Sequence, residues 1–247
     1  MRRFFLPALS VGELQLPADQ AHHIRDVLRL TEGTQVEVFD GAGQRAGGEL
    51  VSVSAKGVVV RIRAVQPCGE GGSVMHLTVA AAVPKAARAD WMVEKLSELG
   101  VDVFIPLATA RSVALPRGNG KLDRWNRLAE ESAKQSGRAG VMQIAALTDL
   151  EELIRSTVEG SDTWYLSTDR GAVPLSGSLV AMPLRLTLLI GPEGGWTAEE
   201  IAAFEIRNIA PKRLTASILR IETAAVAAAA IIESALTPPA GNATIEV

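Results

Sequence analysis

Cysteine, histidine and aromatic residues are scarce in this 247-residue chain, which has one cysteine, three histidines and 4% aromatic side chains. The single cysteine, Cys68, excludes an internal disulfide, and the histidines, two of which are the neighbours His22 and His23, lack the spacing of metal ligands. The N-terminus has no continuous apolar run of the kind found in signal peptides, because Pro7 interrupts it. We therefore expect a cytoplasmic protein that binds no metal and does not enter a membrane.

An excess of positive charge is also missing, since the net charge is −3, whereas nucleic-acid-binding domains usually carry a basic surface. The charges are unevenly distributed along the chain. Residues 111–138 include seven basic and three acidic residues, and residues 139–205 include three basic and ten acidic ones. This asymmetry would fit one basic face on an acidic body, although a solvated helix surface gives a similar pattern.

The first part of the chain, to about residue 65, has the pattern of short strands separated by glycine-containing turns. Residues 36–39 and 58–62 are strand-like, and only residues 19–30 look helical. Many short strands of this kind are typical of a small barrel. The glycine-rich run at 67–73 then indicates a linker.

After the linker, apolar strands alternate with amphipathic helices, which predicts βαβ units and a mainly parallel sheet. We expect strands at residues 77–83, 103–107, 163–166 and 186–190, and helices at residues 90–99 and 122–135. Gly100 is placed to end the first of these helices.

One motif in the first part of the chain imitates a dinucleotide site. A strand at 36–39 is followed by Gly41-Ala-Gly-Gln-Arg-Ala46, which matches the glycine fingerprint of that site. The next residues, 49–53, are strand-like rather than helical, and Arg61 stands where a ribose-binding acid is expected. We therefore predict a β-hairpin.

The most informative segment is Gly191-Pro-Glu-Gly-Gly195, which follows the short apolar strand at 186–190. Its glycines permit backbone angles that other residues avoid, and its amide groups could bind a carboxylate, a ribose or an adenine edge. Thr197 and Glu200 have the spacing of a capping box, so a helix should begin near Ala198. The alternative is that this loop only turns a strand into a helix.

A second loop, at residues 214–219, precedes a helix at 222–236 that consists almost entirely of small or apolar residues. A helix that is apolar on all sides is normally buried in a core or an interface. Arg220 and Glu222 are therefore charges at the start of a buried helix. An acid is favoured there by the helix dipole, whereas Arg220 needs an anionic partner.

These two loops together resemble the ribosomal RNA small-subunit methyltransferase E family, which belongs to the SPOUT class of knotted methyltransferases. The resemblance extends along essentially the whole chain. Two departures stand out: the family usually has Gly-Pro-Arg where this chain has Thr215-Ala-Ser217, and it usually has Thr where this chain has Ile221. The matching segments are Arg2-Arg-Phe-Phe5, His22 to Leu30, Phe39-Asp-Gly41, Lys95 to Val101, Glu131 to Arg138, Gly191 to Gly195 and Ser217 to Ala225.

The resemblance implies the fold and the reaction. It implies a PUA-like, RNA-binding β-barrel domain at 1–66, a linker at 67–73 and a SPOUT α/β domain at 74–247 with a deep trefoil knot in roughly 163–236. It implies methylation of uridine N3 in 16S ribosomal RNA (uridine 1498 in the family's usual RNA numbering) by S-adenosylmethionine, during small-subunit maturation. It also implies a homodimer packed through the knotted domains.

By the same resemblance, three loops bind the cofactor, the first of them following the strand at 163–166. The expected cofactor-binding residues are Leu166, Ser167, Thr168, Ile190, Gly191, Glu193, Gly194, Gly195, Leu214, Ala216, Ser217, Ile218 and Leu219. Because residues 215–217 differ from the family's usual sequence, the resemblance implies only backbone contacts from this loop.

The chemistry indicates two catalytic candidates. Uridine N3 is a poor nucleophile until it loses its proton, so a base or a cation that stabilises the resulting charge is needed. We expect Arg220 to stabilise charge on the uracil carbonyls. Glu222 is either a base or the residue that orients Arg220, and we favour the second role.

Basic residues outside these loops are candidates for RNA phosphate contacts, and Arg25 and Arg29 would share one helix face. The predicted RNA-binding residues are Arg2, Arg3, Arg25, Arg29, Lys85, Arg88 and Arg138. Two other functions stay open: a non-enzymatic RNA-binding module, which would bind no cofactor, and a metabolic enzyme that binds a nucleotide phosphate at the glycine loop, for which the usual Lys and Ser/Thr cradle is missing.

Overall fold

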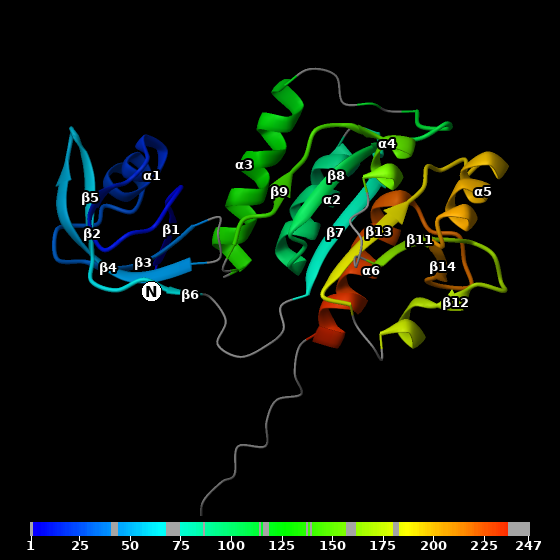
Figure 1. The fold of residues 1–247 in the computed structure, drawn as a ribbon. Coiled ribbons are helices and arrows are strands. Elements are labelled where there is room, and N and C mark those ends of the chain that lie inside the picture. The colour runs from blue at the N-terminus through cyan, green and yellow to red at the C-terminus, as the bar shows by residue number, and fades with distance from the viewer. Residues whose placement is uncertain are drawn as a thin grey trace, which may run out of the picture. The chain divides into compact units, whose positions relative to one another are not determined.

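The computed structural model describes residues 2–40, 44–67, 75–85, 87–113, 115, 119–136, 138, 140–156, 162–179 and 183–236 (Figure 1). Two compact units divide the chain: Met1–Gly72 with Asn126–Met142, and Ser73–Trp125 with Gln143–Val247. Most of the linker expected at 67–73 lies outside the described residues.

The first unit contains a six-stranded sheet with the order β1-β3-β4-β5-β2, and β6 pairs with β4 (Figure 1). Alternate residues of these strands point inward, so that Phe4, Val36, Val38 and Leu50 form its apolar core. The strands are β1 (Arg2–Phe5), β2 (Gly12–Gln15), β3 (Gln35–Phe39), β4 (Gln44–Ser54), β5 (Gly57–Ile62) and β6 (Gln66–Pro67).

The strands on either side of residues 41–43, which lie outside the described residues, pair as the predicted β-hairpin requires. Strands β3 and β4 are antiparallel, with Phe39 opposite Arg45, and β4 continues to Ser54 as a strand. A Rossmann site would need a helix at this position.

The predicted helix at 19–30 is shorter and less regular than expected. An α-helical turn, α1 (Ala18–His22), continues into a π-helical turn, His23–Val27, where the Leu28 amide donates to the His23 carbonyl. Arg29 follows with a left-handed φ of 51°. The prediction that Arg25 and Arg29 share a helix face is therefore wrong, because the wider turn changes the register and the helix ends before Arg29.

The second unit is built on an eight-stranded sheet in which every pair of strands is parallel (Figure 1). Its order is β10-β8-β7-β13-β11-β14-β12, and β9 pairs with β8. The strands are β7 (His76–Ala82), β8 (Val103–Ala108), β9 (Gln143–Ile144), β10 (Thr148–Asp149), β11 (Asp162–Leu166), β12 (Val173–Pro174), β13 (Arg185–Ile190) and β14 (Ala210–Arg213).

The two central strands, β7 and β13, are buried on both faces, as their continuous apolar sequence predicts. The expected βαβ pattern is confirmed, and Gly100, with φ of 106°, ends the helix before β8. The helices of the second unit are α2 (Ala87–Leu99), α4 (Leu150–Arg155), α5 (Ala198–Ile206) and α6 (Ile221–Leu236), while α3 (Asn119–Ser136) begins in the second unit and belongs to the first from Asn126 onward. The trefoil knot implied by the family resemblance stays a prediction.

Helix α6 packs against α2 and against β7 and β13. Ala224, Ala225, Ala228 and Ala229 are buried, and their small size lets the helix approach its neighbours closely. Ile221, Glu222 and Ile232 are buried as well, whereas the remaining residues of α6 are half-buried or exposed in this single chain, so one face of the helix is left uncovered.

None of the helices in the described parts of the chain is long and apolar enough to cross a lipid bilayer. Within the same parts, no three His, Cys, Asp or Glu side chains gather into a group that could hold a metal ion.

Candidate cofactor site

Three loops of the second unit meet where neighbouring parallel strands end. Strand β11 ends at Leu166, β13 at Ile190 and β14 at Arg213, and β11 lies between the other two. The carboxyl ends of parallel strands lie at one edge of a sheet, which is where ligands bind in such folds. The loops that follow these strands surround a cavity of about 390 Å³.

All thirteen residues predicted to bind a cofactor line this cavity. The structure brings them together, and their role in binding stays a prediction. The lining also includes Pro192 and Thr215, which belong to the predicted loops, and residues outside those loops: Tyr165, Trp196, Ile201, Ile221 and Ala224.

The glycines of the 191–195 loop are required by conformation and by space. Gly195 has φ of 69°, in the left-handed region, and its amide donates to the Pro192 carbonyl at 2.9 Å. A Cβ added at Gly191 would lie 2.8 Å from the indole of Trp196, and one at Gly194 would lie 3.2 Å from Cδ of Arg111. Hence a side chain at Gly191 would force Trp196 to move, whereas one at Gly194 would require only a small shift of the Arg111 side chain.

Trp196 connects the first two loops. Its indole Nε1 donates to the carbonyl of Leu166 at 3.0 Å, and its ring packs edge-to-face on Phe204 of α5 and on Tyr165. Burial, followed by the nearby carboxylates Glu205 and Asp169, raises the pKa of Tyr165. A tryptophan directly after two glycines is the only sequence signal for this role, and it is weak.

The turn after β8 holds the same loop from the other side. Arg111 Nη1 donates to the carbonyls of Gly194 at 2.7 Å and Trp196 at 3.4 Å. The carboxylate of Glu200 accepts from the amides of Ala110 and Thr197, and Thr197 Oγ1 accepts from the Glu200 amide. The predicted capping box at the start of α5 is thus confirmed, and it also ties α5 to the turn after β8.

Every residue of the third loop, 214–219, lines the cavity. The Ser167 amide donates to the Lys212 carbonyl at 2.9 Å, which joins the first loop to the end of β14. Thr215 Oγ1 donates to the carbonyl of Ser217, and Ile218 is 83% exposed. The side chains at positions 215–217, where the family usually has Gly-Pro-Arg, therefore lie at the surface of this loop.

The two catalytic candidates, Arg220 and Glu222, have different surroundings. Arg220 is exposed, lies between the lining residues Leu219 and Ile221, and makes no side-chain hydrogen bond or ion pair within the described residues. Glu222 is only 6% exposed, and its partner is Arg88, whose Nη1 lies 3.4 Å from Oε1. The contacts therefore do not support the hypothesis that Glu222 orients Arg220. Because α6 begins at Ile221, Glu222 lies in its first turn and pairs with Arg88 of α2 instead.

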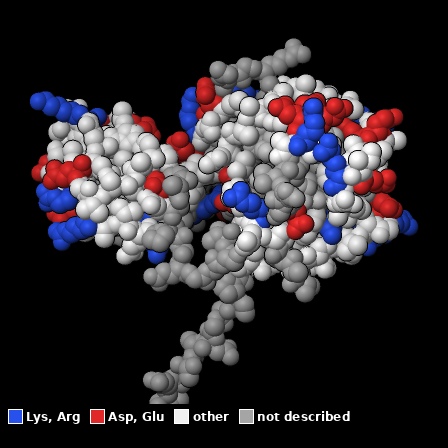
Figure 2. Space-filling view, in the orientation of Figure 1, with Lys and Arg blue, Asp and Glu red and all other residues white. Residues whose placement is uncertain are grey.

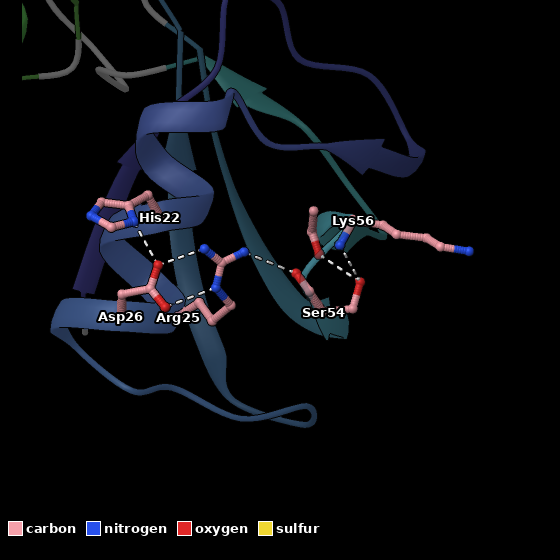
Figure 3. A network of polar contacts seen from close by, with 6 residues as sticks. His22, Arg25, Asp26, Ser54 and Lys56 are labelled. Atoms are coloured by element: carbon pink, nitrogen blue, oxygen red, sulfur yellow. Dashed lines mark hydrogen bonds and ion pairs between the residues drawn. The ribbon is translucent and has the colours of Figure 1, made fainter.

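Two of the predicted RNA-binding arginines of the first unit are neutralised by carboxylates. Arg3 pairs with Glu37 across β1 and β3 and lies over the ring of Phe39. Arg25 donates twice to Asp26 and once to the Ser54 carbonyl, while His22 contacts the same carboxylate (Figure 3).

This network shifts the pKa of both charged groups, Arg25 and Asp26. The hydrogen bond to Asp26 raises the pKa of Arg25, and the same bond lowers the pKa of Asp26. Arg2 and Arg29 are exposed and make no side-chain ion pair among the described residues, and Arg138 is half-buried.

In the second unit, Lys85 is exposed just after β7, while Arg88 pairs with Glu193 as well as Glu222. Figure 2 shows basic and acidic side chains interspersed over the visible face of each unit, rather than gathered into one basic region.

The chain combines a parallel sheet whose loops surround one cavity with a separate β-sheet unit, and comparison with known proteins identifies the class to which this combination belongs. Residues 72–233 match the model of an RNA methyltransferase domain, and residues 16–63 match that of an RNA methyltransferase PUA domain. The chain is therefore an RNA methyltransferase by family.

More specifically, it belongs to the ribosomal RNA small subunit methyltransferase E family. The Synechocystis sp. member is 31% identical over 90% of this chain and 73% of its own length. The Bacillus subtilis member is 28% identical over 91% of this chain and 93% of its own length. The crystal structure of the Neisseria gonorrhoeae enzyme bound to S-adenosyl methionine is 27% identical, has a TM-score of 0.84, and covers 95% of this chain and 97% of that chain.

Proposed function

We propose that this protein transfers a methyl group from S-adenosylmethionine to N3 of a uridine in 16S ribosomal RNA during maturation of the small subunit. Family membership supports the reaction class and the RNA substrate. The observation that carries the proposal is the convergence on one cavity of three loops, each of which follows the carboxyl end of a parallel strand. A ribosomal RNA substrate places the activity in the cytoplasm.

The residues present fit this cofactor. The cavity volume of about 390 Å³ lies in the range of small-molecule sites. Its wall combines backbone from Gly191 to Gly195 with the apolar side chains of Leu166, Ile190 and Leu219, a surface suited to a nucleoside edge. When bound, the cofactor supplies an electrophilic methyl group on a sulfonium.

The chain must then position the uridine and stabilise the charge that develops when N3 loses its proton. Arg220 fits this role because its cation is exposed next to the cavity lining and is not engaged by a carboxylate among the described residues. Glu222 is buried, is paired with Arg88 and does not line the cavity. We therefore assign the substrate contact to Arg220, and we assign no base.

RNA binding is assigned first to the exposed cations Arg2, Arg29 and Lys85, and less to Arg3 and Arg25, whose charges are compensated within the first unit.

We propose the boundaries 1–66 and 74–247 for the two domains. We also propose a trefoil knot in the second domain and a homodimer that covers the half-buried part of α6. Sedimentation should show a dimer at micromolar concentration, and a monomer would contradict that part of the proposal.

Mass mapping of methylated nucleotides in small-subunit rRNA tests the function directly. Cells that lack this protein should lose one N3-methyluridine from 16S rRNA, and the Arg220→Ala variant should not restore it. Arg185→Ala is a matched control, because Arg185 is an exposed arginine at the opposite end of β13. An unchanged methylation pattern would refute the proposed function. The non-enzymatic alternative predicts in addition that calorimetry detects no binding of S-adenosylmethionine.

A further inference from the structure

One nitrogen of Arg88 is shared by two carboxylates from different parts of the second unit. Nη1 lies 3.3 Å from Glu193 Oε1 and 3.4 Å from Glu222 Oε1. Arg88 belongs to the first turn of α2, Glu193 to the loop that lines the cavity, and Glu222 to the first turn of α6. A single cation thus joins three elements that are far apart in the sequence.

Glu222 is the member of this group that most needs a cation. It is 6% exposed, and its second oxygen, Oε2, is buried without a hydrogen-bond partner. A buried carboxylate is costly unless it is paired. Arg88 is the only cation within ion-pair distance of it in the described part of the chain.

Glu193 depends on Arg88 for a different reason. Its side chain is 54% exposed, so burial does not hold it, and its ion pair is with Arg88 alone among the described residues. The nearby Glu222 carboxylate would repel it if the shared cation were removed. Among the described residues that line the cavity, Glu193 is also the only one with a carboxylate.

We propose that Arg88 is a positioning residue of the cofactor site: it holds Glu193, and with it the 191–195 loop, against the start of α6. This assignment rests on the proposed function and replaces the RNA phosphate contact expected from the sequence. Because both contacts use one nitrogen, a lysine ammonium could make them in part, whereas a neutral side chain of similar length could not.

The experiment measures binding of S-adenosylmethionine to the full-length protein by calorimetry, without RNA. Wild-type protein is measured first, because failure of wild-type binding would contradict the proposed function rather than the role of Arg88. Arg88→Met should then raise the Kd about tenfold, which is about 1.4 kcal/mol. Arg88→Lys should recover most of that loss.

Arg124→Met is the matched control, since Arg124 also pairs with a carboxylate, Asp90, but lies on α3 and is not among the residues that line the cavity. Its Kd should equal that of the wild type. Glu193→Gln tests the same link from an exposed side chain whose replacement leaves the core intact, and it should also weaken binding. Combined with Arg88→Met, its effect should be less than additive.

The competing role predicts the opposite pattern. If Arg88 contacts RNA phosphate, Arg88→Met and Glu193→Gln leave the Kd for S-adenosylmethionine unchanged. Arg88→Met then lowers the salt dependence of RNA binding by about one unit of slope. That result would overturn the proposal, as would a Kd for Arg88→Lys equal to that of Arg88→Met.

Discussion

Replacement of Gly191 by alanine tests the architecture of the cavity at its tightest point. The new Cβ would lie 2.8 Å from Cε2 of Trp196, and 3.1 and 3.2 Å from two further atoms of the same ring. The ring has little freedom to move away. Its Nε1 donates to the Leu166 carbonyl, and its edge packs on Phe204.

Two costs and one gain set the size of the effect. Overpacking of a fixed ring costs about 1–3 kcal/mol. If the ring shifts instead, the indole hydrogen bond is lost, at about 0.5–1.5 kcal/mol. The smaller entropy of an unfolded chain with alanine returns about 0.4–1 kcal/mol. Subtracting the entropy gain from the overpacking cost, we expect Gly191→Ala to destabilise the protein by about 1–2 kcal/mol and to weaken binding of S-adenosylmethionine.

Urea unfolding and calorimetry measure these two quantities. Gly120→Ala is the control, because Gly120 lies in α3 and a Cβ there meets no atom within 4 Å. It should not destabilise the helix, with a gain below about 1 kcal/mol because Gly120 lies in the first turn, and it should leave binding unchanged. If Gly191→Ala is as stable as the wild type and binds the cofactor equally well, Trp196 is not fixed as described and the reasoning fails.

Three further predictions concern the surroundings of the site and the first unit. Thr197→Ala should cost about 1 kcal/mol in urea unfolding, because the amide of Glu200 loses its cap, and Thr197→Ser should not. Tyr165 is the only tyrosine, so an absorbance titration reads it alone. The pKa of its phenol should lie above the usual value of about 10. The stability that this raised pKa contributes is complete below pH of about 10 and is lost as the pH rises through the pKa of the folded state. A titration midpoint at or below pH of about 10 would contradict the burial of Tyr165. Asp26→Asn should strengthen RNA binding in filter assays, because it removes the carboxylate that neutralises Arg25; weaker binding would show that Arg25 is needed in its paired orientation.

The sequence predicted the parallel sheet well because each central strand is buried on both faces. A continuous apolar run such as that of β7 or β13 fits only a strand that is covered on both faces. The ends of these two strands lie within one residue of the predicted limits. The start of α5 at Ala198 was predicted as accurately, since a capping box specifies both the first turn and its N-cap.

Other elements have no such local signature. The short strands β9, β12 and β14 have two to four residues, and their pairing is decided by the strands already in the sheet. The π-helical turn at His23–Val27 was missed because the apolar spacing of Ile24 and Leu28 fits an ordinary α-helix equally well.

At the site, backbone geometry was predictable and side-chain partners were not. The glycine motif identified the 191–195 loop, and strand order brought the 166–168 and 214–219 loops beside it. The link from Arg88 to Glu222 joins residues 134 positions apart, and that from Arg111 to Gly194 joins residues 83 apart. Only the folded chain shows that Glu222 faces α2 rather than Arg220.

A crystal structure of this protein with S-adenosylmethionine tests the central claim most directly. The adenosine should lie in the cavity enclosed by residues 166–168, 191–195 and 214–219, held mainly by main-chain amides and carbonyls, with the methyl group directed toward Arg220. A ligand bound elsewhere on the protein, or one whose methyl group points away from Arg220, would contradict it.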